Sequence, residues 1–81
     1  MDAIKDTVKS YILKEFLPGE DPAELKDDTP LITGGILDSL ATLKLVAFLE
    51  EHYAVTVKAH ETDVDHLNTV TDISKLVASK L

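Results

Sequence analysis

The feature that most constrains the fold is a stretch from about Ser39 to Tyr53 in which apolar side chains cover most of the circumference of a helix. Such a helix needs neighbours on several sides, so we expect it at the centre of a helical bundle. The 81-residue chain contains no cysteine, which excludes disulfides and thiolate zinc sites as stabilising devices.

Two further segments show helical spacing. One runs from Ala3 to Phe16, and the other follows Thr69, which reads as the N-cap of a capping box with Asp72. A short helical turn fits between residues 61 and 67, with Val64 and Leu67 facing inward. Residues 54–59 alternate like a strand but have no partner strand, so an extended loop is expected. The prediction is one all-α domain, residues 1–81: a small bundle of three main helices plus one short helix.

A long loop must join the first two main helices. Residues 17–37 contain three prolines and three glycines among many acidic residues, which argues against a helix. Loops of roughly 20 residues are uncommon in compact domains unless buried side chains hold them. We therefore expect the apolar side chains of this loop to pack inward: Leu25, Leu31, Ile32, Ile36 and Leu37.

The charge balance restricts the partners. Fifteen acidic residues against eight basic ones give a net charge of −7, which disfavours nucleic acid and anionic membrane surfaces and attracts basic proteins. No apolar run approaches the length that crosses or inserts into a membrane. A monomeric, cytoplasmic protein with basic partner proteins is expected.

The most informative segment for function reads Gly35-Ile36-Leu37-Asp38-Ser39-Leu40. It places a serine at the start of the central helix, where free backbone N–H groups and the helix dipole favour a bound or attached phosphate. The alternative is that Asp38 or Ser39 is only an N-cap, and position alone favours that simpler interpretation.

This segment resembles the carrier-protein superfamily of acyl, peptidyl and D-alanyl carrier proteins. The signature is the serine of Asp38-Ser39-Leu40 at the head of the second helix. The resemblance extends over about half of the chain, in three blocks: from Thr29 to Ile32, from Gly35 to Tyr53, and at Thr69-Val70. It implies a stand-alone carrier domain.

The resemblance implies that Ser39 receives 4′-phosphopantetheine from coenzyme A through a phosphopantetheinyl transferase, with Asp38 and Leu40 beside it at the cofactor site. The chain would not be an enzyme. It would hold an acyl or aminoacyl group as a thioester for a loading ligase and for downstream acyltransferases or synthases of lipid or secondary-metabolite pathways. Partners would bind at Asp38, Leu40, Lys44, Glu50 and Glu51. Since Ala41 and Lys44 stand where fatty-acid carriers are often acidic, an aminoacyl or specialised cargo is favoured.

Three alternatives to a carrier domain can be compared with the sequence. A serine hydrolase is disfavoured because the Gly-x-Ser-x-Gly elbow is missing around Ser39. A metal site among residues 60–66 matches no familiar ligand spacing, so no metal is expected. The remaining alternative is an acidic helical interaction module with no prosthetic group, which composition and helix pattern fit equally well.

Overall fold

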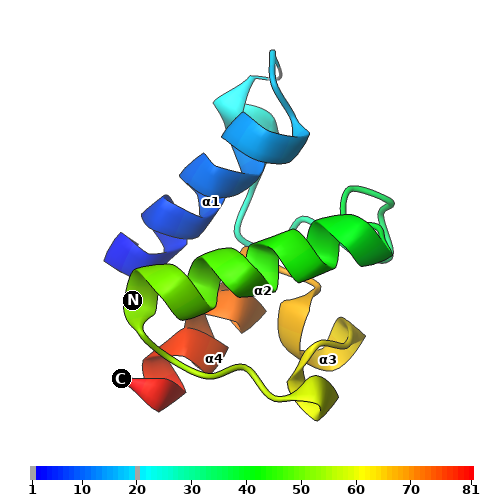
Figure 1. Cartoon of the computed structure of the whole chain (residues 1–81). Helices are drawn as coiled ribbons and strands as arrows, with labels where there is room; N and C mark the ends of the chain where they lie inside the picture. Colours follow the sequence, from blue (N-terminus) through cyan, green and yellow to red (C-terminus); the bar gives the residue numbers. More distant parts are fainter. Residues whose placement is uncertain (1, 20) are drawn as a thin grey trace.

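The chain folds into a helical bundle, shown by a computed structural model in Figure 1. It describes residues 2–19 and 21–81, without the side chains of Asp2 and Pro22. Over these residues the elements are α1 (Asp2–Phe16), the 3-10 turn η1 (Pro22–Glu24), α2 (Ser39–Tyr53), the 3-10 turn η2 (Ala59–Glu61), α3 (Val64–Leu67) and α4 (Val70–Lys80). The predicted all-α fold, with three main helices, one short helix and a long loop between α1 and α2, is confirmed.

The helices enclose one apolar core. In Figure 1, α2 crosses the middle of the molecule with α1 above it, while α4 and α3 lie below. The backbones of α1 and α4 also approach each other closely. Every main helix contributes fully buried side chains to the core, as the helical spacing predicts: Val8 and Ile12 from α1, Leu45 and Leu49 from α2, and Val70, Ile73 and Val77 from α4. The predicted cap of α4 is present, because the Thr69 hydroxyl accepts a hydrogen bond from the Asp72 N–H at 3.0 Å.

The long loop is held by both burial and polar contacts. Leu25, Leu31 and Leu37 are buried as expected, and Ile32 and Ile36 are half-buried. Asp27 joins the loop to two helices: its carboxylate pairs with Lys5 and Lys9 of α1, and its carbonyl oxygen accepts hydrogen bonds from the N–H and hydroxyl of Thr71 in α4. The loop is therefore tied to the bundle near its middle.

One inward-facing prediction is wrong. Val64 is 43% exposed, whereas Leu67 of the same short helix is completely buried. A helix of four residues has room to bury only part of its surface, and Leu67 occupies the side that faces the core. The apolar coat of α2 is also incompletely buried, because Leu40 and Leu43 are 62% and 63% exposed.

Of residues 54–59, which were predicted to form an extended loop, residues 55–58 form a connection outside helices and strands. The prediction is wrong at its two ends: Ala54 has a left-handed backbone (φ 55°) that ends α2, and Ala59 begins η2. The residues described contain no strand. Glu50 of α2 fixes this connection, since its carboxylate accepts a hydrogen bond from the Val57 N–H at 3.0 Å. Among the helices of the described chain, none combines the length and the apolar character needed to span a membrane.

Glu61 ties the connection between α2 and α3 to the end of α4. Its carboxylate accepts hydrogen bonds from the Lys80 ammonium and the Lys58 N–H, both at 2.8 Å. The bond from Lys80, followed by the bond from Lys58, lowers the pKa of Glu61 to about 2. A carboxylate with a lowered pKa stabilises the fold above its unfolded pKa near 4.5, and the stabilisation is lost as the pH falls toward 2.

We predict that Glu61→Gln lowers the free energy of unfolding at neutral pH, because the charged hydrogen bonds are lost. The difference between wild type and variant should shrink as the pH falls below 4.5. Urea unfolding of both proteins between pH 3 and pH 7 measures this difference in the free energy of unfolding. Lys80→Met should show the same dependence on pH. A difference that stays constant with pH would show that Glu61 does not act through its charge.

Candidate functional site

Two neighbouring residues at the head of α2, Asp38 and Ser39, have different surroundings. The Asp38 carboxylate accepts a hydrogen bond from the Ala41 N–H at 2.7 Å, which makes Asp38 the N-cap. The Thr42 hydroxyl donates to the Asp38 carbonyl oxygen at 2.8 Å and closes the first turn. Ser39, the first helical residue, is exposed, and its hydroxyl takes part in none of the hydrogen bonds found within residues 2–19 and 21–81. Of the two candidate N-caps, Asp38 and Ser39, it is Asp38 that caps the helix.

The loop before Ser39 is clamped by Asn68, between α3 and α4. The Asn68 side-chain oxygen accepts hydrogen bonds from the Ile32 N–H at 2.9 Å and the Thr33 N–H at 3.0 Å. The Asn68 backbone oxygen accepts another from the Leu31 N–H at 2.6 Å. Three successive N–H groups of the loop therefore bind one residue, 35 to 37 positions away in sequence, and this fixes the path of the chain toward Ser39.

Two glycines turn the loop back toward α2. At Gly34 a Cβ atom would collide with the carbonyl oxygen of Pro30, so a larger residue does not fit. Gly35 has a φ of +83°, in the left-handed region that favours glycine. The turn brings the Leu37 N–H to the Leu31 carbonyl oxygen at 2.9 Å, and Asp38 and Ser39 follow directly.

Ser39 lies on an open groove of about 640 Å³ between the head of α2 and the start of α3. Its walls carry apolar side chains from the loop and both helices, together with the polar side chains of Thr42, Thr62 and Asp63. The exposed side chains of Leu43 in α2 and Val64 in α3 face this groove from opposite sides. Sequence reasoning assigned Val64 to the core and did not assign Leu43 a role at the site, because helical spacing cannot distinguish an apolar groove from an apolar core.

The Asp63 carboxylate on the groove wall is held by His66. It accepts hydrogen bonds from the His66 N–H at 3.2 Å and lies 2.7 Å from His66 Nδ1. The hydrogen bond between the two side chains lowers the pKa of Asp63 and raises the pKa of His66. The Asp63 carboxylate beside the groove therefore keeps its charge to a lower pH than an ordinary aspartate does. Within the described part of the chain, no group of three or more His, Asp or Glu side chains is placed to hold a metal ion.

The predicted partner-binding residues do not all lie in one environment. Leu40, Lys44 and Glu51 are exposed on α2, and Leu40 adjoins Ser39. The Asp38 carboxylate caps the helix, and the Glu50 carboxylate holds the connection at Val57. The structure thus gives Asp38 and Glu50 structural tasks, while the contribution of all five residues to partner binding stays a prediction.

The chain is similar to curated D-alanyl carrier proteins of three streptococci. It is 37% identical over 68 residues to that of Streptococcus mutans serotype c, which covers 82% of this chain and 85% of the relative. It is 37% identical over 71 residues to that of Streptococcus pyogenes serotype M5 (88% and 86%), and 33% identical over 70 residues to that of Streptococcus suis (86% and 85%). No protein-family model matches the chain.

A solved structure has the same fold. A chain in the crystal structure of an FAD-dependent dehydrogenase matches with a TM-score of 0.78 and 31% identity, covering 86% of this chain and 97% of that chain. Because nearly all of the solved chain is matched, it is about as short as this one. The similarity is therefore to a small helical domain and not to a flavin-binding domain.

At these identities and coverages, the chain belongs to the carrier-protein superfamily, where its relatives are the D-alanyl carrier proteins. It is a carrier and not an enzyme, so it works with enzymes that load it and use its cargo.

We predict that Asn68→Ala lowers the free energy of unfolding by about 1 to 2 kcal/mol, because the Ile32 and Thr33 N–H groups lose their acceptor. Amide hydrogen exchange at these two residues should become faster. Asn68→Asp keeps an acceptor oxygen and should retain most of the stability. An equal loss of stability in both variants, or no loss in Asn68→Ala, would contradict the role of Asn68 in holding the loop.

Proposed function

We propose that Ser39 Oγ carries a 4′-phosphopantetheine arm and that the chain holds an aminoacyl group on it. The single observation that carries this proposal is the separation of roles at the head of α2, where Asp38 caps the helix and leaves the Ser39 hydroxyl exposed beside a groove. A dedicated transferase would join Ser39 Oγ to the phosphorus of the arm and release the adenosine bisphosphate part of coenzyme A.

The residues around Ser39 fit this group. The exposed hydroxyl is accessible to a transferase, and the positive end of the α2 dipole favours a phosphodiester at the first helical turn. The exposed side chains of Leu40, Leu43 and Val64 offer apolar contacts to the arm or to an enzyme that docks over it. When bound, the arm supplies a terminal thiol that holds the cargo as a thioester, a chemistry for which this chain has no cysteine of its own.

The cargo we propose is D-alanine or an amino acid of similar size. The curated relatives at 33% to 37% identity are named D-alanyl carrier proteins, which supports an aminoacyl cargo. The groove beside Ser39 is open rather than enclosed by the bundle, and Leu45, Leu49 and Ile73 are completely buried core residues. This arrangement suits a small group on an exposed arm. The partners would be a phosphopantetheinyl transferase, an ATP-dependent amino-acid ligase and an enzyme that accepts the aminoacyl group.

Attachment of the arm is tested by intact mass after incubation with coenzyme A, Mg²⁺ and a broad-specificity phosphopantetheinyl transferase. We predict a gain of one phosphopantetheine unit in wild type and no gain in Ser39→Ala. Ser10→Ala is the matched control, because Ser10 is also an exposed helical serine and should not affect modification. If the wild-type mass does not change while a known carrier in the same tube is modified, the acidic interaction module becomes the better interpretation.

The cargo is tested on the modified protein with ATP, D-alanine and a D-alanine-specific ligase, with L-alanine in a parallel reaction. We predict a gain of one alanyl group that requires the arm, prefers D-alanine and is removed by hydroxylamine, as a thioester requires. If the modified protein gains no alanyl group while a known D-alanyl carrier protein in the same tube is loaded, the proposed cargo would be overturned and the arm on Ser39 would stand.

A further inference from the structure

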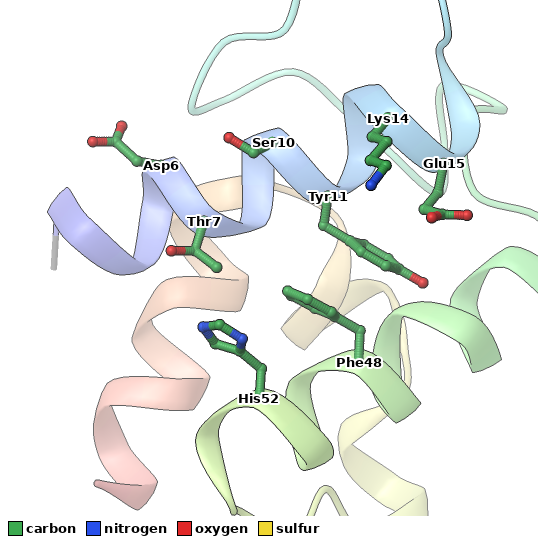
Figure 2. A pocket seen from close by; sticks show the side chains of 8 residues that line it. All are labelled: Asp6, Thr7, Ser10, Tyr11, Lys14, Glu15, Phe48 and His52. Atoms are coloured by element: carbon green, nitrogen blue, oxygen red, sulfur yellow. The ribbon is translucent and has the colours of Figure 1, made fainter.

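A second groove lies at the opposite end of α2 from Ser39. It has a volume of about 600 Å³ and is lined by six side chains of α1, between Asp6 and Glu15, and by Phe48 and His52 of α2 (Figure 2). Since an α-helix rises 1.5 Å per residue, His52 stands about 20 Å from Ser39 along the helix axis. The groove is therefore separate from the proposed site of the arm.

Three aromatic rings form the floor of this groove. The rings of Tyr11 and Phe48 stack with centroids 4.0 Å apart and planes 14° apart, and the His52 ring stacks on Phe48 at 5.2 Å and 21°. The Tyr11 hydroxyl donates to the Lys44 carbonyl oxygen at 3.2 Å, which fixes its ring across the two helices. Tyr11 and Phe48 are half-buried and His52 is exposed, so a rigid aromatic surface is open to solvent.

Carboxylates surround the aromatic floor. Asp6 and Glu15 are exposed lining residues, and the exposed Glu51 lines an adjoining hollow that shares Phe48 and His52 with the groove. Lys14 is the ammonium group on the α1 wall. With the net charge of −7, the field around the groove favours a cation. The Phe48 ring is stacked between Tyr11 and His52, so these two outer rings are the ones that can offer a face to a ligand. A guanidinium group meets both requirements, because it can pack its flat face on an outer ring and pair with carboxylates through two hydrogen bonds.

We propose that this groove is a docking site for an arginine-bearing segment of a basic partner protein. The role of this site rests on the carrier function proposed above. An enzyme bound there holds the carrier at the far end of α2. Ser39 and the exposed Leu40, Leu43 and Val64 then stay free to move into an active site. Docking and presentation of the cargo are thereby assigned to different ends of one helix.

The test uses the full chain labelled with ¹⁵N and the probe peptide acetyl-Leu-Arg-Phe-Arg-Leu-amide, followed by amide chemical shifts. We predict that the shifts concentrate at Thr7, Ser10, Phe48 and His52. Glu15→Lys should weaken binding about fivefold, and Lys14→Gln should strengthen it about twofold, because exposed charge pairs are worth up to about 1 kcal/mol. Asp28→Lys is the matched control: it makes the same charge change at an exposed position outside the groove and should have a smaller effect.

Three outcomes would overturn the docking site: no shifts in the groove, shifts concentrated at Leu40, Leu43 and Val64, or equal weakening by Glu15→Lys and Asp28→Lys. Equal binding of a peptide with citrulline in place of arginine would overturn the arginine requirement. Ser39→Ala should bind the peptide as wild type does, and Glu15→Lys should still accept phosphopantetheine. Failure of the groove can thus be distinguished from failure of the proposed carrier chemistry.

Discussion

The clamp at Asn68 is the contact on which the position of Ser39 depends. Ser39 follows a loop of more than twenty residues, and such a segment would otherwise be free to move the start of α2. The oxygens of Asn68 hold three successive N–H groups of this loop, and Asp27 ties its middle to α1 and α4. Leu31, which is one of the clamped residues, and Leu37, which follows them, are both buried, so the end of the loop is fixed before the helix begins.

With the loop fixed, the head of α2 combines a rigid support with the exposed side chain of Ser39. Asp38 and Thr42 close the first turn, and Leu45 and Leu49 anchor the helix in the core one and two turns further on. The Ser39 hydroxyl takes no part in this support. The arm that we propose on Ser39 requires this separation, because the arm must reach several enzymes while the domain stays folded. The same helix offers the aromatic groove at its other end.

Helical periodicity was sufficient to predict the main elements, because the three main helices each bury a continuous apolar face. The start of α2 at Ser39 and the cap at Thr69 were also readable, since capping depends on residues close in sequence. The surroundings of Ser39 could not be predicted from the sequence. Val64 was assigned to the core, but it faces a groove formed with residues more than twenty positions away. The structural role of Glu50 depends on the path of the chain at Val57, which local sequence does not specify.

The function proposed for this chain requires that Ser39 carries the arm in the protein that cells make. The most direct measurement is fragmentation mass spectrometry of the protein isolated from its own cells without exposure to added transferase. We predict that the peptide containing Asp38, Ser39 and Leu40 carries phosphopantetheine on Ser39, and that part of it holds an aminoacyl group that mild base removes. An unmodified Ser39 throughout the native protein, or an arm on another residue, would contradict this claim.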